Sequence, residues 1–336
     1  MLIRFFKNNS IFHYFLILCI AFFLWYPKFQ ETIFYEEINK GILYAFIEGL
    51  FNVSPLFANI FSFIFLFFQG LLINVICQNY KFLPKYNVLP AFIYIVLMSI
   101  NPDLCILNPY LFSNFFIIIA LFFILKQYDK EKPYMKILNI GLMFSISALF
   151  LQTTIIYIIP MIISFMILGY KRWRYWIIIF IAYLIPLLFI FTYYFVYDKI
   201  PELLEYYKQF IRFDYSFISS SLTQINIWQV LIYIHLVLTF ILSLVFVIRY
   251  RKGKQVAQMK LYSIILWFIL FSFTGLLMPA LNKIHLISIF YPMLAIVFSV
   301  KFVFSKNKIF NEIILSVLLL LMAGFKLQMQ LLYLQN

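Results

Sequence analysis

Long apolar segments recur along the whole chain, and they constrain its fold more than any other feature. Each runs for about 15–23 residues with almost no charge, close to the ~20 residues that a helix needs to cross a bilayer. We expect eleven crossings: Ile11–Tyr26, Pro55–Cys77, Tyr86–Ile100, Pro109–Leu125, Ile137–Leu151, Thr154–Leu168, Tyr175–Tyr197, Ile225–Val247, Leu261–Leu281, Leu286–Phe304 and Ile309–Phe325. The pattern predicts an all-α integral membrane protein with one polytopic domain over residues 1–336.

Composition supports a single membrane domain and excludes several function classes. Hydrophobic residues make up 65% of the chain, well above the roughly 45–50% typical of soluble domains. The formal net charge of +14 does not indicate a nucleic-acid partner, because the basic residues lie in short loops between the segments, where they report topology. Three scattered cysteines and three scattered histidines give no metal-ligand spacing, and no cofactor motif is present.

The stretch between Ile137 and Gly169 is expected to contain two crossings. As one helix it would be about 50 Å long, too long for a single crossing. Basic clusters precede and follow it, and both are expected on the cytoplasmic side, so the chain must cross an even number of times. We expect the turn near Gln152-Thr153-Thr154.

Charge distribution predicts a cytoplasmic N-terminus, with Arg4 and Lys7 ahead of a first segment that is retained as an anchor. Eleven crossings then place 19 of the 26 Lys and Arg residues inside and 7 outside. Acidic residues sort the other way. Nine lie outside: Glu31, Glu36, Glu37, Glu48, Asp103, Asp198, Glu202, Glu205 and Asp214. Acid-driven chemistry is therefore expected at the extracytoplasmic face.

Two outside loops, the first and the fourth, are long, and we expect an interfacial helix in each. In Glu31–Asn52, helical periodicity places Glu36, Lys40, Tyr44 and Glu48 on a water-facing side. Phe34, Ile38, Ile42, Ala45, Phe46 and Gly49 share the opposite, lipid-facing side. In Asp198–Gln224, Pro201 suits a first helical turn.

The charged rim suggests chemistry on a lipid-linked substrate. Glu31, Glu36 and Glu37 are candidate catalytic bases for an acceptor hydroxyl. Arg212, Lys283, His285 and Lys208 are candidates to hold a lipid phosphate. The alternative interpretation is a solvated linking helix, with cations that only snorkel to the interface. Charges within the apolar segments are almost absent, which argues against an ion-coupled transporter, and His13 and His235 are expected to be structural.

The order of these features resembles the C-type (GT-C) membrane glycosyltransferases. A first span leads into a long outside loop with the acidic pair Glu36-Glu37, and a basic rim follows near the C-terminus. The block Asn139–Leu142 through Ser147–Leu149 is similar to their paired middle helices, as is Asn108-Pro109-Tyr110 with Asn114 at a span head. The chain also resembles an uncharacterised family of bacterial inner-membrane proteins. In the superfamily the first-loop acid is often Asp, which this loop lacks, so the identity of the base stays open.

The resemblance implies a glycosyltransferase of the bacterial inner membrane that serves the cell envelope. Its donor would be a polyprenyl phosphate-linked sugar and its acceptor a secreted protein, lipid or glycan. Two other functions remain open from the sequence. One is a transporter or flippase for a lipid-linked or amphipathic substrate, and the other is a noncatalytic membrane subunit of an envelope or secretion assembly.

Overall fold

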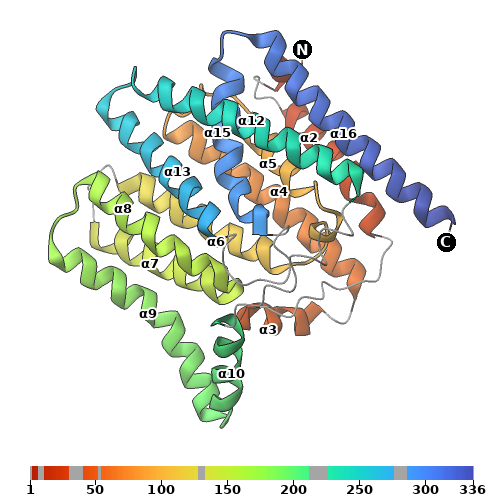
Figure 1. Ribbon diagram of the computed structural model, residues 1–336. Helices are drawn as coiled ribbons and strands as arrows, with labels where there is room; N and C mark the ends of the chain where they lie inside the picture. The colour runs from red at the N-terminus through yellow and green to blue at the C-terminus, as the bar shows by residue number, and fades with distance from the viewer. Residues whose placement is uncertain are drawn as a thin grey trace.

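The computed structural model describes residues 2–6, 11–29, 41–51, 54–127, 133–211, 226–275 and 286–335. Figure 1 shows helices, and no strand occurs in these ranges. The α-helices are α1 Leu2–Phe5, α2 Ile11–Phe29, α3 Ile42–Phe51, α4 Pro55–Asn79, α5 Leu89–Met98, α6 Pro109–Lys126, α7 Pro133–Phe150, α8 Ile158–Leu168, α9 Trp173–Val196, α10 Ile200–Ile211, α12 Ile227–Arg251, α13 Val256–Gly275, α15 Tyr291–Phe304 and α16 Lys308–Gln335. The 3₁₀ helices are η1 Pro102–Leu104, η3 Gln152–Tyr157 and η4 Ile287–Phe290.

Eight helical segments in the described ranges are long and apolar enough to cross a membrane. They are Pro55–Asn79, Pro109–Lys126, Pro133–Phe150, Trp173–Val196, Ile227–Arg251, Val256–Phe273, Ile287–Phe304 and Lys308–Gln328. By length and composition, the chain is an all-α, multi-pass membrane protein. The three other expected spans coincide with the shorter apolar helices Phe12–Tyr26, Leu89–Met98 and Gln152–Leu168.

The core is built around α5 and α15. Every residue of α5 from Leu89 to Met98 is buried, and α5 packs between α4 and α15. Every residue of α15 from Tyr291 to Val303 is buried as well. By contrast, α9 and α12 expose many large apolar side chains. Exposed apolar faces on long helices are the expected contact surface for lipid chains.

The predicted break within Ile137–Gly169 is confirmed, and the two crossings stay a prediction. Helix α7 ends at Phe150, and Leu151 is extended, with φ −146° and ψ 106°. The Thr154 hydroxyl donates to the Leu151 carbonyl at 2.8 Å, and the Ser147 hydroxyl donates to Thr154 Oγ1 at 3.2 Å. These bonds satisfy polar groups that the broken helix would otherwise leave unpaired in a buried position.

The expected span Tyr86–Ile100 is longer than the helix that forms there. Helix α5 covers ten residues, about 15 Å of rise and roughly half of a bilayer core. The chain then runs through Ser99–Leu107, with only the short η1 helix, before α6 begins. Non-helical backbone inside a membrane protein is tolerated where it is buried in protein or lines a polar cavity, and most of this stretch is buried.

The two ends of the bundle differ in the elements that they carry. Helices α3 and α10 lie together at one end, at the bottom of Figure 1. The connection between α12 and α13 lies at the opposite end of the same view. We refer to these as the α3–α10 end and the α12–α13 end.

Candidate functional site

Most of the sequence-predicted site residues lie outside the described residues. These are Glu31, Glu36, Glu37, Arg212, Lys283 and His285. Lys208 is described and is exposed on the last turn of α10. The segments that contain the others are flanked by described residues. These flanking residues include Gly41, Asn226 and Leu286.

A small apolar cluster joins the two long loops that the sequence singled out. Ile42 at the start of α3 and Leu203 of α10 pack together with Leu149 of α7 and Ile190 of α9. Tyr206 packs against the same group. The first loop and the loop after α9 therefore meet, although they are separated by about half of the chain.

Gly41 allows the first loop to approach the end of α7 closely. A Cβ atom at this position would overlap the backbone carbonyl oxygens of Leu149 and Phe150. Backbone atoms at a helix end cannot move aside as a flexible side chain can, so only glycine fits here. The start of α3 is therefore fixed sterically against the end of α7.

Tyr44 fixes α3 against the turn between α5 and α6. Its hydroxyl donates to the Leu107 carbonyl oxygen at 2.8 Å, and its side chain is only 1% exposed. The expected water-facing position of Tyr44 is therefore wrong. Phe46, expected to face lipid, is 44% exposed and packs edge-on against Tyr193 at 5.2 Å. The side of α3 that helical periodicity assigned to water therefore includes a residue that packs into the protein interior.

Helix α10 places its charged groups outward and a tyrosine inward. Glu202, Glu205 and Lys208 are exposed, whereas the Tyr206 hydroxyl is buried beside the Ile42 backbone and the Gln152 side chain. Burial, reinforced by the neighbouring Tyr207, raises the pKa of Tyr206 above its ordinary value. At neutral pH this hydroxyl is therefore an uncharged hydrogen-bond donor.

The buried turn Ser99–Asn108 is held by its own side chains. Asn108 Oδ1 accepts from the Leu111 amide at 2.8 Å and caps α6. Its Nδ2 donates to the carbonyls of Leu104 and Ile106 at 2.9 and 2.8 Å. Trp25 Nε1 donates to Ser99 Oγ at 3.0 Å, which ties α2 to the same turn. Asn108 therefore serves to build the turn and is fully engaged in it.

Polar groups from distant helices surround this turn. Tyr233 of α12 donates to Asn101 Oδ1 at 2.6 Å, and Asn114 Nδ2 donates to the Ser288 carbonyl at 3.0 Å. Several buried atoms here have no hydrogen-bond partner among the residues the structure describes: Asn101 Nδ2, Asn114 Oδ1, Ser288 Oγ and Tyr291 Oη. Unpaired buried polar atoms are costly, so this group is suited to bind a polar ligand or water.

Two lysines are buried, one within an expected apolar segment and the other directly after the last one. Lys326 of α16 is 8% exposed, and its Nζ lies 3.7 Å from Cys105 Sγ in the buried turn. Lys301 of α15 is 4% exposed, and its Nζ lies 5.7 Å from the centre of the Phe302 ring. Buried ionisable groups in membrane segments are functional candidates by default. Of the two, Lys326 belongs to the turn at the α3–α10 end.

No family model, curated protein or solved structure matches the chain. The chemistry of the site therefore has to be judged from its residues. The described part of the site offers neutral hydroxyl and amide groups, one buried ammonium and the exposed carboxylates of α10. No group of three His, Cys, Asp or Glu side chains suited to a metal ion occurs among the described residues.

The site residues that sequence reasoning missed share one property: they come together only through the fold. Tyr44 meets Leu107, and Lys326 meets Cys105, across 63 and 221 residues of sequence. Asn114 was noted at the head of a span, but its contact with Ser288 spans 174 residues. Lys326 directly follows an apolar stretch, and that placement was the one available signal for it.

Proposed function

We propose that the chain is an integral membrane glycosyltransferase that uses a polyprenyl phosphate-linked sugar at the extracytoplasmic face of a bacterial inner membrane. In this proposal the chain crosses eleven times, with its N-terminus in the cytoplasm. Helices α2, α5 and the η3–α8 pair complete the crossings begun by the eight long helices. The α3–α10 end then faces outward, and α3 and α10 lie at the interface.

One observation carries the proposal: described residues link both long acidic loops to a single polar end of the bundle. The Ile42–Leu203 cluster joins α3 to α10. Tyr44 joins α3 to the buried turn, and Lys326 joins that turn to α16. Asn226 at the start of α12 donates to Gln328 of α16 at 2.8 Å, two residues after Lys326 in the sequence.

The proposed mechanism divides base and phosphate binding between these segments. Glu36 or Glu37, with Glu31 as the third candidate, takes the proton from the acceptor hydroxyl. The hydroxyl oxygen attacks the sugar anomeric carbon, and the polyprenyl phosphate leaves with the electrons of the broken C–O bond. Arg212 with Lys283 or His285 balances the charge that develops on that phosphate, and Lys208 assists at the rim. The acceptor is a secreted protein, lipid or glycan.

Lys326 adds a described cation to this proposal. Its ammonium group is buried beside the turn and donates to the Cys105 sulfur at 3.7 Å. A sulfur atom is a weak acceptor, so the ammonium retains donors for a phosphate oxygen. We therefore add Lys326 to the candidates that bind the donor phosphate.

The deciding experiment is transfer from labelled polyprenyl phosphate sugars by the purified protein in nanodiscs. The double variant Glu36→Gln with Glu37→Gln should abolish transfer while expression and insertion are unchanged. Glu205→Gln is the matched control, because Glu205 is an exposed carboxylate at the same end, and it should retain activity. Full activity in the double variant would eliminate this base assignment, and reporter fusions that place residues 31–40 in the cytosol would eliminate the topology.

A transporter or flippase is the second candidate, favoured by the interruptions at Ser99–Leu107 and Leu151–Tyr157, most of whose residues are buried. Discontinuous helices near the membrane midplane are common at substrate sites of transporters. The same nanodisc preparation, reconstituted into vesicles, separates the two functions. Translocation of a labelled lipid-linked sugar without any product of transfer would favour the flippase, whereas sugar transfer without translocation would favour the enzyme.

A further inference from the structure

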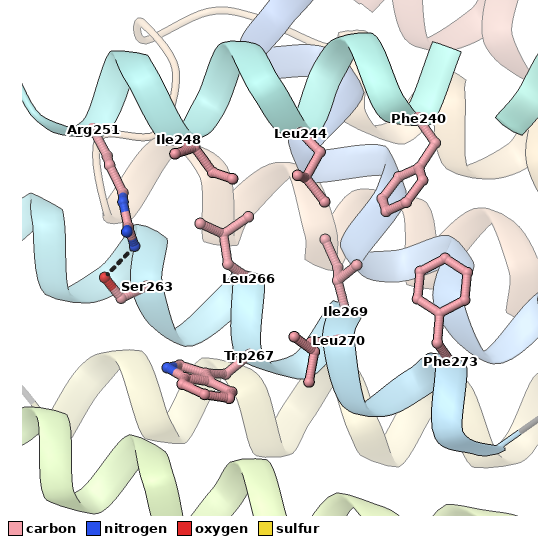
Figure 2. Close-up of a pocket in the computed structure, with 10 residues that line it drawn as sticks. All are labelled: Phe240, Leu244, Ile248, Arg251, Ser263, Leu266, Trp267, Ile269, Leu270 and Phe273. Carbon is pink, nitrogen blue, oxygen red and sulfur yellow. Dashed lines mark hydrogen bonds between the residues drawn. The ribbon is translucent and has the colours of Figure 1, made fainter. Parts of the chain in front are cut away.

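A groove runs between α12 and α13 on the surface of the bundle. It encloses about 360 Å³ and is lined mainly by apolar side chains. Figure 2 shows Phe240, Leu244 and Ile248 of α12 facing Leu266, Ile269 and Leu270 of α13. Arg251 and Ser263 mark one end of the groove, and Phe240 and Phe273 mark the other.

The length of the groove matches one leaflet of a bilayer. Phe240 and Arg251 are eleven positions apart on one helix, which corresponds to about 16 Å of rise. This is close to half of the ~30 Å hydrocarbon core. An acyl chain that begins at the membrane surface beside Arg251 would therefore end near the bilayer midplane beside Phe240 and Phe273.

The polar end of the groove holds one guanidinium group in position. Arg251 Nη1 donates to Ser263 Oγ at 2.9 Å, and the Ser263 hydroxyl in turn donates to the Met259 carbonyl at 2.7 Å. An arginine has five N–H donors, so most remain for an external acceptor. Ser263 is a positioning residue here, since its own proton is committed to the backbone.

The positive charge around the Arg251 end of the groove favours an anionic ligand. Residues 249–260 contain Arg249, Arg251, Lys252, Lys254 and Lys260 and no Asp or Glu. Basic groups next to membrane helices attract anionic headgroups, at about 1 kcal/mol for each Lys or Arg near the surface. The α12–α13 end lies opposite α3 and α10 in Figure 1, so the groove is separate from the site proposed above.

We infer that this groove binds an anionic phospholipid of the leaflet at the α12–α13 end. Its phosphate lies on Arg251, and one acyl chain lies along Leu244, Ile248 and Leu270. The groove is apolar, is about as long as one leaflet is thick, and ends at the positioned guanidinium group of Arg251. These are the features that an anionic phospholipid requires. The inference does not depend on the transferase proposal, because the groove and the proposed transferase site share no residues and lie at different ends of the bundle.

Trp267 provides a direct reporter of occupancy, because it lines the groove and is 38% exposed. The full chain in nanodiscs of phosphatidylcholine would be titrated with brominated-chain phosphatidylglycerol, whose bromine atoms quench nearby tryptophan. The chain has five tryptophans, so the Trp267 signal is taken as the difference between wild type and Trp267→Phe. Brominated phosphatidylcholine in the same nanodiscs reports non-selective chain contact.

We expect brominated phosphatidylglycerol to reach half-maximal quenching at about fivefold lower mole fraction than brominated phosphatidylcholine. Arg251→Gln should bring the two curves together, whereas Arg249→Gln, an exposed residue on the same helix but outside the groove, should keep them apart. An unchanged phosphatidylcholine curve shows that the variant is folded. The inference is overturned if the wild-type curves coincide or if Arg251→Gln leaves the difference intact. It is also overturned if a polyprenyl phosphate displaces the brominated lipid at lower mole fraction than unlabelled phosphatidylglycerol does.

Discussion

Replacing Gly41 with alanine tests whether the first loop is fixed against the end of α7. The new methyl group would overlap the carbonyl oxygens of Leu149 and Phe150, and neither backbone atom can rotate away. Overpacking of this kind typically costs about 1–3 kcal/mol. Gly49 gives a matched control eight residues later, because a Cβ there meets nothing within 4 Å. Gly49 lies in the last turn of α3, and alanine in place of a helical glycine should stabilise by at most about 0.5–1 kcal/mol.

The two variants should therefore shift stability in opposite directions, with a difference of about 1.5–4 kcal/mol. Thermal unfolding of the detergent-purified protein measures this, since 1 kcal/mol corresponds to a shift of about 2–4 °C in domains of 150–250 residues. Gly41→Ala should melt several degrees below wild type, and Gly49→Ala at or slightly above it. Wild-type melting of Gly41→Ala, or an equal loss in both variants, would refute the close approach.

Two further substitutions test the packing in the same assay. Tyr44→Phe removes the hydrogen bond to the buried Leu107 carbonyl and should destabilise by about 1–3 kcal/mol, whereas Tyr86→Phe, at a 65% exposed side chain, should change little. Gly169→Ala places a side chain at φ +85° and should cost about 1–2 kcal/mol. Gly253→Ala, where the nearest atom is 3.8 Å from the new Cβ, should be close to neutral, and equal losses in the two glycine variants would contradict the left-handed assignment.

The long helices could be predicted from the sequence because a bilayer crossing needs an apolar run whatever its neighbours are. The break after α7 was equally accessible, since length and flanking charge both required it. The N-terminal turn of α10 was found from Pro201, whose fixed φ and missing N–H suit that position. Each of these features was predicted from residues that are close together in the sequence.

The buried turn and its neighbours could not be predicted, because their environment is set by distant segments. Helix α5 is apolar on all sides, so its sequence is the same for a lipid-facing span and for a core helix. Tyr44 was assigned to water because helical periodicity separates only two faces and does not show that Leu107 offers an acceptor. Lys326 follows an apolar run, and only the fold brings it to Cys105.

At the α3–α10 end, the effect of a substitution on transfer can be measured separately from its effect on stability. Three bonds among the described residues at this end join parts of the bundle: Tyr44 to Leu107, Asn114 to Ser288, and Asn226 to Gln328. None of these bonds involves a proposed base. Substituting Glu36 or Glu37 leaves these three bonds in place, so a loss of transfer with unchanged melting would locate the defect in the chemistry. A parallel loss of both would mean that those glutamates support the fold, and the base would then have to be sought elsewhere.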